Sequence, residues 1–226
     1  MGTMFATIQA NQYSENSALL DQMFRLRKQV FVDTLNWDIP AQGSYERDEY
    51  DDCFPVYLVW FDRPSGDLIA SIRLMPTTGP SLLNDVFRST YPETMTLSAP
   101  GIWEATRACF NNENLRKHAP DISPTLAFCH LMLAIHECAF HHGIHTFVTN
   151  YEPHLARIYK KSGARFDEIG RSSEFGDRPV CCGVFDVSRE LLSDMQTKLG
   201  TVIHVHKDPK HGTRQISAER TLELAS

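Results

Sequence analysis

One short stretch of the sequence combines a glutamate and an arginine with residues typical of a buried strand. Ile102–Phe110 reads IWEATRACF, and Glu104 and Arg107 are its charged residues. A carboxylate is costly to bury in such a strand unless it is paired or takes part in chemistry. Glu104 is therefore a candidate general base, with an ion pair to an arginine as the alternative. Strict alternation predicts Trp103, Ala105 and Arg107 on one face and Glu104 and Thr106 on the other.

Charged and aromatic residues also gather in two segments before this strand. Arg27 and Phe31 are four apart, so a helix places them on one face, and Trp37 follows where that helix should end. Asp48 and Asp51 are three apart in an acidic segment. Taken singly, such residues also fit a packed core or a solvated surface, and both interpretations stay open. In the segment Leu68–Pro76, Arg73 is a natural counter-charge for an aspartate.

The elements that must position these residues follow from apolar periodicity and turn residues. Helical spacing predicts a helix over about 17–35, and two alternating segments joined by RPSGD predict a hairpin of Val56–Asp62 and Leu68–Pro76. Further strands are predicted at 5–10, 102–110, 146–150 and 179–187, and further helices at 82–88, 124–142, 154–161 and 188–199. This order predicts an α+β fold with one central, mostly antiparallel sheet flanked by helices. We expect a single domain over residues 1–226, with a mobile tail after about residue 207.

Composition excludes several classes of protein. The chain has 226 residues, 42% hydrophobic and 22% charged, which is ordinary for a globular protein. The sequence has no run of 18 apolar residues, so it predicts no membrane span. A net charge of −6 argues against nucleic acid as a partner. The six cysteines and ten histidines lack the spacings of a zinc site, so we expect no metal. Reduced thiols and no signal-like start predict a cytoplasmic protein.

Together the charged and aromatic residues form a pattern that resembles the acyl-homoserine-lactone (autoinducer) synthase family. The matching positions are Arg27, Phe31, Trp37, Asp48, Asp51, Arg73, Phe87, Glu104 and Arg107. The runs FRLRKQVF at 24–31 and IRLMPT at 72–77 are also typical, and the resemblance extends from about residue 5 to 187. It implies a GNAT-like acyltransferase fold. It also implies S-adenosylmethionine as the amine donor and an acyl-carrier protein, or alternatively acyl-coenzyme A, as the acyl donor.

The resemblance implies binding roles that suit the chemistry of S-adenosylmethionine. Asp48 and Asp51 suit its cationic groups, and Arg27 or Arg107 suits its carboxylate. Phe31 and Trp37 are expected to pack on its adenine or face its sulfonium. The expected role of Arg73 is to hold the aspartates, although a plain salt bridge is an equal alternative. Because S-adenosylmethionine is consumed, no cofactor is expected.

For catalysis, the resemblance makes Glu104 the general base that takes a proton from the amine, and Arg107 is the second expected catalytic residue. Backbone N–H groups near Thr106 and Phe147, where strands splay, are expected to steady the oxyanion. Trp103 is expected in the acyl or phosphopantetheine region. In the family, a Thr or Ser on the strand after the long helix accompanies a preference for 3-oxo acyl chains. The two candidates here are Thr146, which we favour, and Thr149.

Two other functions remain as alternatives. An ordinary GNAT-type N-acetyltransferase usually has a glycine-rich loop that binds pyrophosphate, but residues 111–123 (NNENLRKHAPDIS) contain no glycine. This absence also favours a carrier-protein donor. A non-catalytic binding module is the second alternative, and the presence of both Glu104 and Arg107 argues against it.

Overall fold

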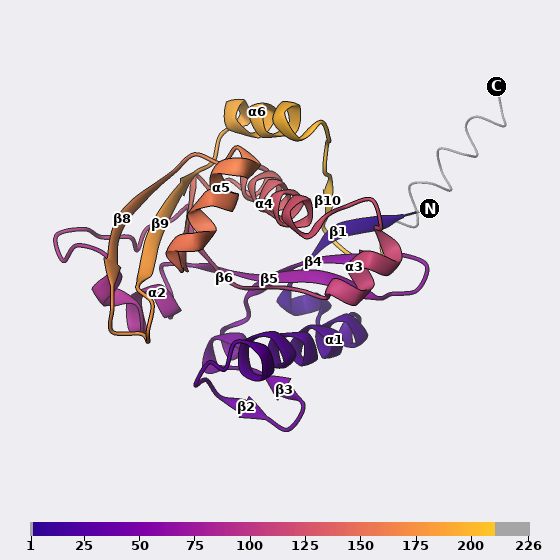
Figure 1. Cartoon of the computed structure of the whole chain (residues 1–226), viewed down its shortest axis with the longest axis horizontal. Coiled ribbons are helices and arrows are strands. Elements are labelled where there is room, and N and C mark those ends of the chain that lie inside the picture. The colour runs from indigo at the N-terminus through magenta and orange to yellow at the C-terminus, as the bar shows by residue number, and fades with distance from the viewer. Residues whose placement is uncertain (1, 211–226) are drawn as a thin grey trace.

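The computed structural model describes residues 2–210, and one eight-stranded sheet forms its centre (Figure 1). The strands are β1 (Thr3–Ile8), β4 (Val56–Asp62), β5 (Leu68–Pro76), β6 (Ile102–Phe110), β7 (Thr146–Tyr151), β8 (Phe166–Ser172), β9 (Val180–Asp186) and β10 (Val205–His206). Their order across the sheet is β10-β1-β4-β5-β6-β7-β9-β8. Neighbouring strands are antiparallel except for the pairs β1–β10 and β6–β7. The predicted mixed fold with a mostly antiparallel sheet is confirmed.

Helices cover both faces of the sheet. They are α1 (Ser17–Arg27), α2 (Leu82–Asp85), α3 (Asn112–His118), α4 (Pro124–His141), α5 (Ala156–Ser162) and α6 (Arg189–Leu199). Figure 1 shows α4, α5 and α6 on one side of the sheet and α1 on the other. Alternation along β4 explains this sandwich: Leu58 and Trp60 join the core cluster that includes α4, whereas Tyr57 and Val59 join the one that includes α1. Each such buried side chain contributes about 1.5–3 kcal/mol.

The first helix changes its geometry before it ends. Residues Leu19, Leu20, Met23 and Leu26 are buried at helical spacing, which explains α1. The chain then continues as a π-helix over Lys28–Thr34. The predicted helix over about 17–35 is therefore confirmed in extent, but its second part has a wider turn.

Two of the longer elements escaped prediction because they bury little apolar surface. Helix α3 buries Leu115 alone, although Asn111 caps its start through hydrogen bonds from the amides of Glu113 and Asn114. Strand β8 lies at the edge of the sheet, is mostly exposed or half-buried, and has a register shift between Glu168 and Gly170. Their sequences therefore lack the apolar periodicity on which the prediction depends.

Smaller differences occur elsewhere. The expected loop at 38–54 contains two short strands, β2 (Ala41–Gln42) and β3 (Tyr45–Glu46), and a 3-10 turn at Glu49–Cys53. Short 3-10 turns also occur at Ala10–Gln12, Arg88–Thr90 and Pro153–Leu155. The expectation of a mobile tail falls largely on residues 211–226, outside the described part. No helix within residues 2–210 is long and apolar enough to cross a membrane.

Candidate active site

The π-helical turn brings Phe31 against Trp37. Leu35 donates its backbone N–H to the carbonyl of Val30, five residues earlier, which is the wide turn often found at functional sites. Asn36 then adopts a left-handed backbone with φ of 54°, and the Trp37 N–H donates to the carbonyl of Phe31. The two rings stack with centroids 4.9 Å apart. Phe31 is buried, while Trp37 is 40% exposed and presents an aromatic surface to solvent.

The acidic segment is folded back on itself by its own carboxylates. Asp48 caps the 3-10 turn Glu49–Cys53, since its side chain accepts the N–H of Tyr50 at 3.1 Å. Asp51 in turn accepts the N–H of Asp48 at 2.9 Å. This reciprocal capping explains the three-residue spacing of the two aspartates. It also turns both carboxylates toward α1 and the sheet.

Arg27 meets this segment in the protein interior. Its guanidinium donates to both carboxylate oxygens of Asp51, at 2.8 and 2.9 Å, and through Nε to Glu46 at 2.5 Å. Tyr57 on β4 donates to the same aspartate at 2.8 Å. Burial opposes ionisation of Asp51, but the hydrogen bonds and charge of Arg27, with Arg73, lower its pKa overall. Glu46 is fully buried, and its part in the site was not predicted.

Arg73 and Arg107 complete the network from the sheet. Arg73 donates to both oxygens of Asp48 and, at 3.0 Å, to Asp51, so the expected pairing with the aspartates is present. Arg107 donates to Glu46 at 3.1 Å and to Asp48 at 2.9 Å. Three arginines thus face three carboxylates, and their formal charges cancel. The two aspartates face arginines in this structure rather than open space.

The predicted alternation along β6 is wrong at Arg107. Thr106 pairs with Arg73, but the next paired residue, Cys109, faces Ser71, so an extra residue is accommodated in β6. Arg107 adopts a left-handed backbone with φ of 57° at this bulge. Arg107 therefore reaches the same acidic network as Arg73, on the α1 side, instead of sharing a face with Ala105. A left-handed arginine costs about 1 kcal/mol or more, which the network offsets.

Glu104 is buried beside this network without joining it. Its side chain is 1% exposed, and neither carboxylate oxygen has a hydrogen-bond partner among the described residues. Burial raises the pKa of Glu104 to about 7, while the charge of Arg73 and the nearby backbone amides of Leu83 and Leu82 oppose the rise. Those amides lie outside normal hydrogen-bond geometry. The alternative of an ion pair between Glu104 and an arginine is therefore absent from this structure.

The parallel pair β6–β7 opens directly after Glu104. Its register runs from Ile102 opposite Thr146 to Glu104 opposite Val148, and pairing then stops. Thr149 lies at the opening, where its hydroxyl donates to the carbonyl of Ala105 at 2.8 Å.

The predicted acyl-region residues fall on different parts of this opening. Thr146 lies at the closed end, opposite Ile102, so the position favoured from sequence is farther from the opening than Thr149. Phe147 is buried and pairs with both Trp103 and Phe185, which places its backbone inside the paired part. Trp103 is half-buried and packs against the core cluster that includes Phe147. Thr106 lies farther along β6, beyond the opening.

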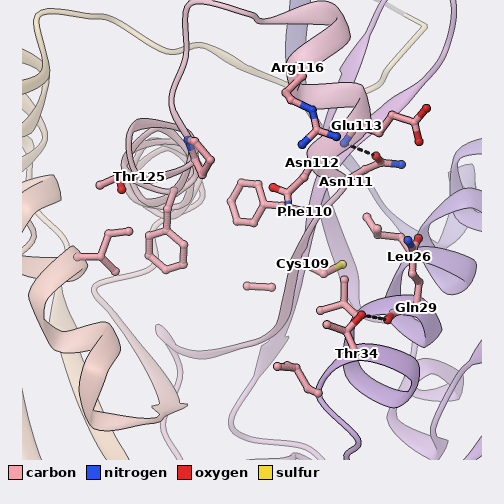
Figure 2. A pocket seen from close by; sticks show the side chains of 16 residues that line it. Leu26, Gln29, Thr34, Cys109, Phe110, Asn111, Asn112, Glu113, Arg116 and Thr125 are labelled. Carbon is pink, nitrogen blue, oxygen red and sulfur yellow. Dashed lines mark hydrogen bonds between the residues drawn. The ribbon is translucent and has the colours of Figure 1, made fainter.

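A cavity of about 620 Å³ lies between the end of β6, the α1 and π-helical segment, and the start of α4. Figure 2 shows its lining residues arranged around an open space. The lining consists of Leu26, Gln29, Val30, Thr34, Leu35, Ala108, Cys109, Phe110, Asn111, Asn112, Glu113, Arg116, Pro124, Thr125, Phe128 and Ile158. None of the predicted site residues is among them, although the cavity adjoins Phe31 and Arg107 along the chain. Sequence reasoning missed it because segments far apart in the chain form its walls.

Comparisons with known proteins show which family this chain resembles. The family model for autoinducer synthase matches residues 11–195. An acyl-homoserine-lactone synthase of Rhizobium etli is 34% identical over 186 residues, which cover 81% of this chain and 84% of the relative. The solved structure of a CoA-dependent acyl-homoserine lactone synthase, BjaI, with SAM and isopentyl-CoA has a TM-score of 0.81 at 25% identity. It covers 92% of this chain and 94% of that one.

The fold also extends to acetyltransferases. A putative N-acetyltransferase from Lactobacillus plantarum has a TM-score of 0.51 at 19% identity and covers 82% of this chain and 99% of its own. This likeness concerns the fold alone, and it supports the GNAT-like architecture. The match to the family model and the identity to the Rhizobium etli enzyme together show that this chain belongs to the autoinducer synthase family, as an acyl-homoserine-lactone synthase.

Proposed function

We propose that the protein transfers an acyl group from a thioester to the α-amine of S-adenosylmethionine and closes the product to an N-acyl-homoserine lactone. The amine nitrogen attacks the thioester carbonyl, and the thiol leaves. A carboxylate oxygen of the acylated substrate then attacks the carbon next to the sulfonium, and methylthioadenosine leaves. The reaction needs no cofactor, because S-adenosylmethionine supplies its own leaving group. We place it in the cytoplasm, where that substrate is made.

One observation carries the proposal: next to the strand opening, the buried carboxyl of Glu104 has no hydrogen-bond partner among the described residues. An amine must lose its proton to acylate productively, and a base with a pKa near the working pH performs this step well. Glu104 has a pKa raised to about 7 and no hydrogen-bond partner among the described residues. It therefore accepts the amine proton, directly or through one water. Backbone N–H groups near Thr106 then stabilise the oxyanion, because that strand is unpaired on its β7 side.

The arginines differ in their capacity to hold the substrate carboxylate. All three guanidinium nitrogens of Arg27 and of Arg73 already donate to protein side chains. Arg107 uses Nε and Nη2, which leaves Nη1 without a hydrogen bond in the described part of the chain. We therefore assign the substrate carboxylate to Arg107. In this proposal Glu46 and Asp48, which are themselves held by Arg27 and Arg73, fix its guanidinium in place.

The aromatic pair supplies the surface for the adenosyl group. Arg107 lies over the ring of Phe31, with its Cζ 5.7 Å from the centroid, so the carboxylate and aromatic contacts lie side by side. The exposed ring of Trp37 then packs on the adenine or faces the sulfonium, a contact worth about 0.5–2 kcal/mol. Both an acyl-carrier protein and acyl-coenzyme A remain as donors. The likeness to a structure containing isopentyl-CoA supports the second.

The test is to incubate the purified protein with S-adenosylmethionine and either acyl donor. We expect methylthioadenosine, free thiol and lactone in equal amounts by mass spectrometry and thiol titration. Thiol release without methylthioadenosine would identify an ordinary N-acyltransferase instead. Binding of either substrate with no product would identify a non-catalytic module.

A further inference from the structure

The cavity beyond the strand opening changes in character along its length. Apolar side chains such as Leu26, Val30 and Phe128 line one part, whereas Asn111, Asn112 and the two charged lining residues come from the β6–α3 connection and α3. An acyl thioester on a pantetheine arm has the same polarity, because the arm is neutral and ends in a phosphate. This phosphate is common to acyl-carrier proteins and coenzyme A.

We propose that Arg116 binds this phosphate and so positions the acyl donor. The inference rests on the proposed function, because it assumes a phosphopantetheine thioester as the substrate. Figure 2 shows the Arg116 side chain reaching from α3 at the cavity edge. A guanidinium matches phosphate in charge and in the geometry of its N–H groups.

Arg116 differs from the other cations of α3. Lys117 donates to Asp67 at 2.8 Å, and the Nε2 of His118 lies 2.7 Å from the same aspartate. Both side chains are therefore occupied by a partner outside the cavity. Within residues 2–210, Arg116 makes no hydrogen bond or ion pair, although it lines a cavity with a carboxylate nearby. It is the cation of this helix that is available for a ligand.

The backbone of the connection between β6 and α4 does not provide a glycine-rich loop, which is the usual way to bind such a phosphate. The segment from Asn111 to Ser123 has no glycine, so it cannot form a glycine-rich loop around a phosphate. The Asn111 side chain already accepts the amides of Glu113 and Asn114, at 3.1 and 3.0 Å. We therefore assign to a side-chain cation the contact that backbone amides supply in glycine-rich loops.

Glu113 allows a second test of the proposal, because its removal should have the opposite effect to removal of Arg116. It lines the same cavity three residues before Arg116, and these are the two charged residues in the lining. A carboxylate at this place repels a phosphate. Removing Glu113 should therefore favour a phosphorylated donor, whereas removing Arg116 should disfavour it.

The test compares acyl-phosphopantetheine with acyl-pantetheine, which differ by the phosphate, each carrying the acyl group that the parent enzyme uses best. Arg116→Gln should raise the KM for the phosphorylated donor about three- to tenfold and leave the other unchanged. Arg116→Lys should restore most of the loss. Glu113→Gln should lower the KM for the phosphorylated donor alone. Lys117→Gln is the matched control on the same helix, and its KM for the phosphorylated donor should equal that of the parent.

Acyl-coenzyme A and an acyl-carrier protein then identify the source of the phosphate. A rise with both donors supports binding of the phosphate next to pantetheine, whereas a rise with coenzyme A alone would mean that Arg116 binds the nucleotide phosphates and would overturn this assignment. The proposal is overturned if Arg116→Gln leaves the KM unchanged for every phosphorylated donor, or changes both pantetheine donors equally. Failure of the proposed function is distinct, since the parent would then release no methylthioadenosine with any donor.

Discussion

Arg27 and Asp51 are joined by two hydrogen bonds of 2.8 and 2.9 Å between side chains that are 1% and 0% exposed. This pair connects the start of the π-helical turn to the acidic segment 24 residues later. The same aspartate accepts hydrogen bonds from Tyr57 and Arg73, so one carboxylate joins α1, β4 and β5. The network therefore stabilises the fold as well as fixing the side chains of the site.

We predict a large loss of stability when Asp51 is changed to Asn. The change leaves Arg27 and Arg73 buried with one counter-charge fewer, and breaking a buried pair this way costs about 3–5 kcal/mol. The measurement is the free energy of unfolding from urea titration. Asp52→Asn is the matched control, because Asp52 is 71% exposed and pairs with the exposed Arg47. It should cost less than about 1 kcal/mol. Equal effects of the two changes would show that the buried network adds no more stability than an exposed ion pair.

The opening between β6 and β7 makes Thr149 the residue to test for recognition of the third acyl carbon. Its hydroxyl lies at the opening, while Thr146 lies at the closed end. Thr149→Val keeps the shape of the side chain and removes the hydroxyl, which would turn from the Ala105 carbonyl to donate to a 3-oxo group. Such a hydrogen bond is worth about 0.5–1.5 kcal/mol, so the preference between 3-oxo and unsubstituted donors should change roughly three- to tenfold.

Thr146→Val is the control for this prediction, and its ratio of kcat/KM values for the two donors should stay at that of the parent. A ratio that moves with Thr146→Val, and not with Thr149→Val, would support the assignment favoured from the sequence. If neither change alters the ratio, no hydroxyl on β7 recognises this carbon.

Local patterns predicted the strands of the site well, because the burial of each strand follows from the apolar residues within its own segment. Ile102–Phe110 and the hairpin Val56–Asp62 and Leu68–Pro76 have the predicted bounds. The orientation of Arg107 could not be predicted, since its bulge depends on pairing with β5. Glu46 was missed for a similar reason: its partners, Arg27 and Arg107, lie 19 and 61 residues away in sequence. Its position two residues before Asp48 was the available signal.

Replacing Glu104 with Gln separates catalysis from binding. The amide has nearly the same shape but cannot accept the amine proton, so kcat should fall about 10²-fold or more, with little change in the Kd for S-adenosylmethionine. Calorimetry measures that Kd. The variant should also unfold no more easily than the parent at pH 8, because burial of the ionised Glu104 is unfavourable. A kcat within threefold of the parent would remove Glu104 from this role.

The pH dependence of kcat/KM tests the central claim most directly. Only the ionised form of Glu104 accepts a proton, and its pKa in the free enzyme is raised to about 7. Activity should therefore be present above pH 7 and fall as the pH decreases through 7, towards tenfold per unit. The α-amine of the substrate titrates in the same range, so the residual activity of Glu104→Gln serves as the reference. We predict that the parent shows a break near pH 7 that Glu104→Gln lacks. The same break in both proteins would contradict the assignment of Glu104 as the general base.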